Sequence, residues 1–242
     1  MSEHAGHAPR VSGTRRAMWR AMLLDDPRTE LVLVRHAQQL DPEPGAPLAA
    51  SYDRPLSATG RRQAGLVAEY LRDERFDAVY CSTLSRARET AAAVCAVGHD
   101  RPPAVVLDDL NEVEVYGGVP PGATLDQILA EAALEDALAA FLRSRRWDAL
   151  PFTEASSSLR RRAAAALSTI ARSHKGGRVC VVAHGGVLNA FLAEVLSAGP
   201  DMFFQPGHAS VARVFHWEET WALQSLNEQC HLNDEGESLV TY

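Results

Sequence analysis

The stretch Leu31-Val32-Leu33-Val34-Arg35-His36 sets four consecutive apolar residues directly before an arginine and a histidine. An uninterrupted apolar run of this length is typical of a strand that is buried on both faces, as in a parallel sheet. Four prolines and a glycine fall within residues 37–56, which predicts a loop after this strand. We therefore expect Arg35 and His36 to lie at the carboxyl end of a buried strand.

Further apolar segments alternate with stretches of helical periodicity along the chain. We predict strands over 31–34, 78–80, 104–107, 178–183, 211–217 and 221–226, and helices over 57–73, 84–97, 124–143, 157–173 and 187–197. This alternation predicts an α/β fold, in which a mostly parallel sheet is flanked by helices on both faces as a three-layer sandwich. Folds of this kind bind ligands at the carboxyl ends of their strands.

Composition limits the class of protein. The chain has 242 residues, of which 46% are apolar, and this is enough for one large core and excludes a disordered chain. We expect residues 1–28 to form a tail with a short helix over 14–24. Residues 29–242 are expected to form a single domain, in which 112–155 is a candidate cap segment over the substrate.

Charge and hydrophobicity argue against two kinds of partner. The formal net charge of −7 is unlike the basic surface of a nucleic-acid-binding domain. The longest apolar run is far too short to span a membrane. Four dispersed cysteines predict no disulfide framework and no zinc site, and they favour a reduced cytoplasmic location; these are Cys81, Cys95, Cys180 and Cys230.

Reactive side chains follow four of the predicted strands. Arg35-His36 ends the first strand, Arg86 lies shortly after the second, Glu112 follows the third, and His184-Gly185-Gly186 follows the strand over 178–183. Arginine presents a planar fork that matches phosphate oxygens, and a helix start opened by glycines offers backbone N–H groups to an anion. A neutral histidine can act as a nucleophile. This set predicts a site for a phosphate dianion, and a phosphomonoester fits it best.

Five blocks, in the same order, resemble the histidine phosphatase superfamily, which includes the cofactor-dependent phosphoglycerate mutases. The blocks span about residues 29–230 and are Leu31–Gln38, Asp53–Ala64, Tyr80–Ala91, Leu110–Glu112 and Val181–Gly186. The resemblance implies a phosphoglycerate mutase-like fold. It also implies a small phosphorylated metabolite as substrate and chemistry that needs neither a metal nor another cofactor.

The resemblance implies a role for each matching residue. His36 is implied to be the nucleophile that forms a phosphohistidine, and Glu112 is implied to protonate the leaving alcohol. The remaining groups are implied to hold the phosphoryl oxygens, with His184 also counted as catalytic; they are Arg35, Arg86, His184 and Gly185.

The sequence departs from the family pattern at the expected pocket wall. Ala37-Gln38 replaces the Gly-Glu that commonly follows the nucleophile, and we expect Gln38 and Ser57 to line the pocket. Ala155-Ser156 stands roughly where many members have Glu-Ser. We interpret His208 and His231 as packing or surface residues outside the site.

These observations predict a phosphatase that hydrolyses a small phosphomonoester. One alternative is a cofactor-dependent phosphoglycerate mutase, which needs a basic second pocket. Residues 112–155 contain only three cations, and these lie near the far end of a predicted helix, which favours the phosphatase. A second alternative is a protein that binds a phosphorylated ligand on the same fold without catalysis.

Two other classes of hydrolase fit the sequence poorly. Cys95 and Arg101 have the spacing of a cysteine phosphatase loop, but Cys95 falls inside a predicted helix rather than after a strand. A metal hydrolase would need clustered ligands, and a His-Glu-x-x-His motif is absent.

Overall fold

A computed structural model describes residues 28–43, 45–47, 52–98, 100–115, 117, 119, 122–124, 127, 131–234 and 236–242. The predicted helix over 14–24 lies outside these residues, as does part of the one predicted over 124–143. None of the helices in the described ranges combines the length and the hydrophobicity that a membrane crossing requires.

The centre of the fold is a six-stranded sheet with the order β3-β2-β4-β1-β5-β6. β1 (Thr29–Arg35) lies between β4 (Arg178–Ala183), which is parallel to it, and β5 (Val211–Trp217), which is antiparallel. The remaining strands are β2 (Ala78–Cys81), β3 (Val105–Val106) and β6 (Thr220–Glu228), while β7 (Asn233–Asp234) and β8 (Glu237–Ser238) form a separate pair. The mostly parallel sheet is confirmed.

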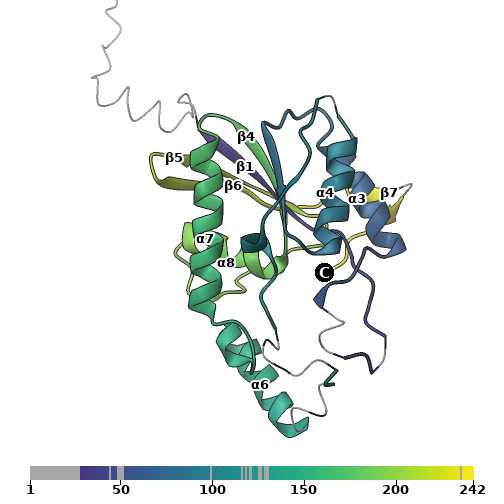
Figure 1. Cartoon of the computed structure of the whole chain (residues 1–242), viewed down its shortest axis with the longest axis vertical. Helices are drawn as coiled ribbons and strands as arrows, with labels where there is room; N and C mark the ends of the chain where they lie inside the picture. Colours follow the sequence, from purple (N-terminus) through teal and green to yellow (C-terminus); the bar gives the residue numbers. More distant parts are fainter. Residues whose placement is uncertain are drawn as a thin grey trace, which may run out of the picture.

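The helices cover both faces of the sheet, as predicted (Figure 1). Leu31 and Leu33 of β1 pack into a core with α7 (Ser156–Ser173) and α8 (Gly185–Val195). The alternate residues Val32 and Val34 pack into a second core with α3 (Ala58–Tyr70) and α4 (Ser85–Ala96). The apolar run in the sequence is therefore explained by a strand whose two faces are both buried.

Local polar contacts determine where the two helices beside the site begin. Ser57 caps α3, and its hydroxyl oxygen accepts the N–H of Gly60 at 2.9 Å. The N-cap residue of α4 makes no such bond, and Asp53 supplies it from the preceding loop by accepting the N–H of Ser85 at 2.7 Å. This anchors the chain before α3 to the start of the helix that carries Arg86.

The predicted cap segment contains an α-helix and a 3-10 helix that extend from the body of the domain. The 3-10 helix η1 (Asp108–Leu110) precedes it, and α6 (Glu131–Ser144) and η2 (Trp147–Ala149) lie within it. Figure 1 shows α6 beyond the amino end of α7, at the same end of the sheet as the segment that follows β1. Asp201 ties this segment to the domain, because its carboxylate accepts the N–H of Trp147 at 3.0 Å.

Candidate active site

His36 lies directly after β1 and is buried, with 3% of its surface exposed. Its Nδ1 atom is 2.7 Å from the carbonyl oxygen of Ala37. Because a carbonyl only accepts hydrogen bonds, Nδ1 carries the proton. The Nε2 atom accepts the Nε–H of Arg86 at 3.2 Å, so a lone pair resides on Nε2. This tautomer makes Nε2 the nucleophilic atom of a neutral imidazole.

The surroundings of His36 keep it uncharged. Burial is the largest cause that holds the pKa of His36 well below its ordinary value of 6.5, followed by the proximity of His184, Arg35 and Arg86. The two arginines disfavour the charged form of His36 because they carry the same sign of charge. The larger effect of burial followed only from the three-dimensional structure.

Two guanidinium groups converge on His36. Arg35 donates from one terminal nitrogen to the carbonyl oxygen of Pro206 and from the other to His208, while its buried Nε–H has no hydrogen-bond partner within the described ranges. Arg86 donates to the carbonyl oxygen of Tyr52 at 2.6 Å. Burial lowers the pKa of Arg35 to about 10 and also lowers that of Arg86. Both positive charges are therefore held in a place that disfavours them.

His184 faces His36 from the start of α8. The centroids of the two rings are 4.9 Å apart. The Ser82 hydroxyl lies 2.6 Å from His184 Nε2 and already accepts the N–H of Leu84, so it can donate its own proton to Nε2. When the hydroxyl donates to Nε2, the proton of a neutral His184 lies on Nδ1, which is buried and has no partner among the described residues. The Nδ1–H of His184 is then a second donor near His36, after the Nε–H of Arg35, that has no partner among the described residues.

Glu112 meets the same helix start. One carboxylate oxygen accepts the N–H of Gly186 at 3.1 Å and the other accepts the N–H of Val113 at 2.9 Å. A Cβ atom at position 186 would lie 2.4 Å from the Glu112 carboxylate, so a larger residue there would displace the carboxylate. Arg162 and Tyr52 hold the main chain of this loop through the Glu112 carbonyl oxygen, at 3.2 and 2.9 Å.

The other predicted site residues are placed differently. Gly185 opens α8 beside Arg35, with the position of a Cβ atom 3.5 Å from the Arg35 Nε. Gln38 and Ser57 bond to each other at 2.7 Å, and Ser57 also caps α3. These contacts stabilise the loop before α3 and the start of that helix, so they account for both residues without a substrate. That Gln38 and Ser57 line a substrate pocket remains a prediction.

His208 lies beside the site, although the sequence favoured a packing or surface role for its side chain. Its ring is buried and its centroid is 5.6 Å from that of His36, with Nε2 2.9 Å from Arg35. β5 runs antiparallel to β1, so its amino end, not its carboxyl end, reaches the site. A search of residues before each strand would have found it. The packing role expected of His231 is confirmed, since its ring stacks on Tyr70 at 4.6 Å.

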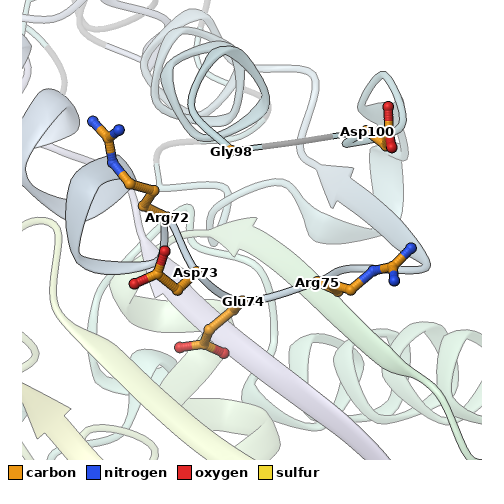
Figure 2. A pocket seen from close by; sticks show the side chains of 6 residues that line it. All are labelled: Arg72, Asp73, Glu74, Arg75, Gly98 and Asp100. Carbon is orange, nitrogen blue, oxygen red and sulfur yellow. The ribbon is translucent and has the colours of Figure 1, made fainter.

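Two other features of the described residues were candidates for a site. Cys95 lies within α4, which confirms that it is not part of a cysteine phosphatase loop. A surface cavity of about 400 Å³ lies at the connections that precede β2 and β3, far along the strands from His36 (Figure 2). It is lined by Arg72, Asp73, Glu74, Arg75, Gly98 and Asp100, and none of these described residues is a histidine or a cysteine. Within the described ranges, no three potential metal ligands are grouped to hold an ion.

Comparison with known proteins agrees with the geometry. Residues 31–229 match the family described as histidine phosphatase superfamily (branch 1). A metal-independent phosphoserine phosphatase of Arabidopsis thaliana is 33% identical in an alignment over 215 residues that covers 86% of this chain and 85% of that protein. Bacillus stearothermophilus YhfR has a TM-score of 0.68 at 25% identity, covering 84% of this chain and 98% of its own.

A third relative was solved with an oxyanion. A mycobacterial glucosyl-3-phosphoglycerate phosphatase in complex with VO3 has a TM-score of 0.67 at 27% identity, covering 82% of this chain and 98% of its own. The family match spans most of the chain and agrees with the resemblance carried by the five sequence blocks. The chain belongs to branch 1 of the histidine phosphatase superfamily.

Proposed function

We propose that this protein is a metal-independent phosphatase that hydrolyses a small phosphomonoester through a phosphohistidine on His36. The observation that carries the proposal is the neutral His36 Nε2 atom, held beside the buried guanidinium groups of Arg35 and Arg86, which form no ion pair with any described carboxylate. The names of the relatives support a small phosphorylated metabolite as the substrate.

The first half of the reaction transfers the phosphoryl group to the enzyme. The lone pair on His36 Nε2 attacks phosphorus while the bond from phosphorus to the ester oxygen breaks in line with it. Arg35, Arg86 and the Nδ1–H of His184 stabilise the charge on the other phosphoryl oxygens. Glu112, in its protonated form, gives its proton to the departing oxygen, so the product leaves as an alcohol.

The second half restores the enzyme. A water molecule gives a proton to the Glu112 carboxylate and attacks the phosphohistidine, and the bond between nitrogen and phosphorus breaks with its electron pair returning to Nε2. Inorganic phosphate, neutral His36 and protonated Glu112 result. Two permanent cations supply the charge stabilisation that a metal ion provides in other phosphatases.

We further propose that residues 29–242 form one domain and that 112–155 covers the substrate. The support is the position of α6 and η2 at the end of the sheet that carries His36, and their anchoring through Asp201. The absence of a metal, of nucleic acid and of membrane partners, and the cytoplasmic location, stay predictions.

The test is turnover of p-nitrophenyl phosphate and of a panel of metabolite phosphates in the presence of EDTA. We expect turnover by the wild-type protein, loss of about a thousandfold or more in His36→Ala, and radiolabel on His36 after acid quench of a labelled ester. Turnover that EDTA abolishes would contradict the proposal. So would rapid interconversion of phosphoglycerates that requires a bisphosphoglycerate, or phosphate binding without hydrolysis of any ester.

A further inference from the structure

A tight turn over residues 207–210 clamps the segment that carries the nucleophile. The turn closes through the N–H of Ser210, which donates to the carbonyl oxygen of Gly207 at 3.1 Å. Ser210 accepts the backbone N–H of Arg35 at 3.0 Å, and Ala209 donates to the carbonyl oxygen of His36 at 3.2 Å. Ala209 has a φ of 56°, which costs about 1 kcal/mol for a residue other than glycine. The two bonds to the nucleophile segment hold this strained conformation.

His208 occupies this turn, and its proton can be assigned. Its Nε2 atom is 2.9 Å from a terminal nitrogen of Arg35, and its Nδ1 atom is 2.9 Å from the hydroxyl oxygen of Thr241. Guanidinium nitrogens only donate, so Nε2 accepts and Nδ1 carries the proton that is donated to Thr241. Burial, with a further contribution from Arg35, lowers the pKa of His208 to about 3, and the ring stays neutral near pH 7.

Thr241 links both sides of the nucleophile to the carboxyl-terminal segment. Its carbonyl oxygen accepts the backbone N–H of His208 at 2.8 Å, and its hydroxyl oxygen also accepts from Gln63 at 2.9 Å. Gln63 in turn accepts the backbone N–H of Gln38 at 2.8 Å. The end of the chain lies close to the end of β1 in Figure 1.

We propose that His208, held by Thr241, is a positioning residue that orients the Arg35 guanidinium toward the phosphoryl group. This inference rests on the proposed function. Arg35 has two of its three nitrogens engaged, by Pro206 and by His208, which fixes the plane of the guanidinium and leaves its Nε–H for a phosphoryl oxygen. Without His208, a buried cationic donor would lose its acceptor and could turn away from the substrate.

The test begins with Thr241→Val, which removes the hydroxyl at nearly constant volume. We expect kcat/KM to fall about tenfold and the inhibition constant of inorganic phosphate to rise by a similar factor, which corresponds to about 1.4 kcal/mol. Thr241→Ser keeps the hydroxyl and should restore both values to within about twofold. Thr220→Val, at an exposed residue of β6, is the matched control and should change neither.

Two double variants test whether the loss of activity in Thr241→Val depends on Arg35 and on His208. In the Arg35→Ala protein, Thr241→Val should change residual turnover by less than about twofold, because the group it positions is gone. His208→Leu should cause the same loss as Thr241→Val, and the two combined should cause no more than one of them. A full additional loss in Arg35→Ala would overturn the proposal, as would a Thr241→Val protein that loses stability but keeps its kcat/KM and phosphate affinity.

Binding of inorganic phosphate, measured by calorimetry, separates this inference from the proposed function. A wild-type protein that binds phosphate but hydrolyses no ester would refute the phosphatase proposal. The affinities of Thr241→Val and Thr241→Ser for phosphate would still decide the role of His208.

Discussion

Arginines lie at both ends of β1, and the two clusters differ in their contacts with carboxylates. At the amino end, Arg178 and Arg213 form ion pairs. At the carboxyl end, Glu112 acts on Arg35 and Arg86 electrostatically, but neither arginine forms an ion pair within the described ranges. Near the amino end, Arg213 contacts Glu74 at 2.6 Å and both Glu30 and Glu228 at 3.2 Å. These carboxylates raise the pKa of Arg213 above its ordinary value. At the carboxyl end, the pKa values of Arg35 and Arg86 are lowered by burial.

The difference separates charges that hold the fold from charges that await a ligand. A cation with several carboxylates around it is stabilised by them, and removing Arg213 would leave Glu30 and Glu74 with Arg178 as their remaining ion-pair partner in the described chain. A buried cation without such partners reduces the stability of the free protein, and an incoming anion offsets that cost. The cluster at the amino end of β1 therefore stabilises the fold. The cluster at the carboxyl end reduces stability and favours binding of an anionic substrate.

The largest expected effect comes from exchanging one arginine for alanine in each cluster. Arg86→Ala should lower kcat/KM about a hundredfold or more, because one phosphoryl-binding group is lost, while the free energy of unfolding stays within about 1 kcal/mol. Arg213→Ala should cost about 2–3 kcal/mol of stability and leave kcat/KM of the folded protein within about threefold. Steady-state kinetics and urea unfolding measure both quantities. Equal losses of activity in the two variants would erase the distinction between the clusters.

The second comparison replaces one carboxylate near each arginine cluster by the neutral amide. Glu112→Gln should lower turnover of an alkyl phosphate about a hundredfold, but that of p-nitrophenyl phosphate less than about tenfold, since nitrophenolate leaves without a proton. Glu74→Gln should affect stability and treat the two substrates alike. Rates on matched pairs of esters provide the readout, and equal losses on both esters in Glu112→Gln would refute its role as proton donor.

The third prediction concerns how the free energy of unfolding changes as the pH falls. The pKa values of His36, His184 and His208 are all lowered in the folded protein, so below about pH 6.5 the unfolded chain binds more protons than the native one. Stability contributed by these groups is therefore present above that pH and is lost as the pH falls. Between about pH 6 and pH 5, His36→Ala should lose about 1 kcal/mol less stability than the wild-type protein in urea unfolding. Identical pH slopes would show that His36 titrates normally.

The smallest effect is stabilisation by inorganic phosphate. At about three times its Kd, phosphate should stabilise the wild-type protein and Arg213→Ala by about 0.8 kcal/mol, and Arg86→Ala by much less at the same concentration. Thermal unfolding with and without phosphate, at constant ionic strength, measures the change. Phosphate that stabilises Arg86→Ala as much as the wild-type protein must bind somewhere else.

Local sequence was sufficient for much of the fold and for the main groups of the site. The apolar run over 31–34 and the alternation of strands with helices predicted the buried sheet, because a strand covered on both faces needs apolar residues at successive positions. Parallel strands bring their carboxyl ends to one edge, and this placed His36 and His184 together before any coordinates were known.

Only the tertiary structure determined which contacts complete that edge. His208 reaches it from the turn before the antiparallel strand β5, and Thr241 reaches it from the carboxyl-terminal segment. No local periodicity encodes either approach. The pairing of Arg213 with carboxylates, and the lack of such partners around Arg35 within the described ranges, also depends on residues far apart in sequence. The type of a residue determines the charge that it carries. Burial and neighbouring groups, which arise only on folding, determine whether that charge stabilises the structure or binds a ligand.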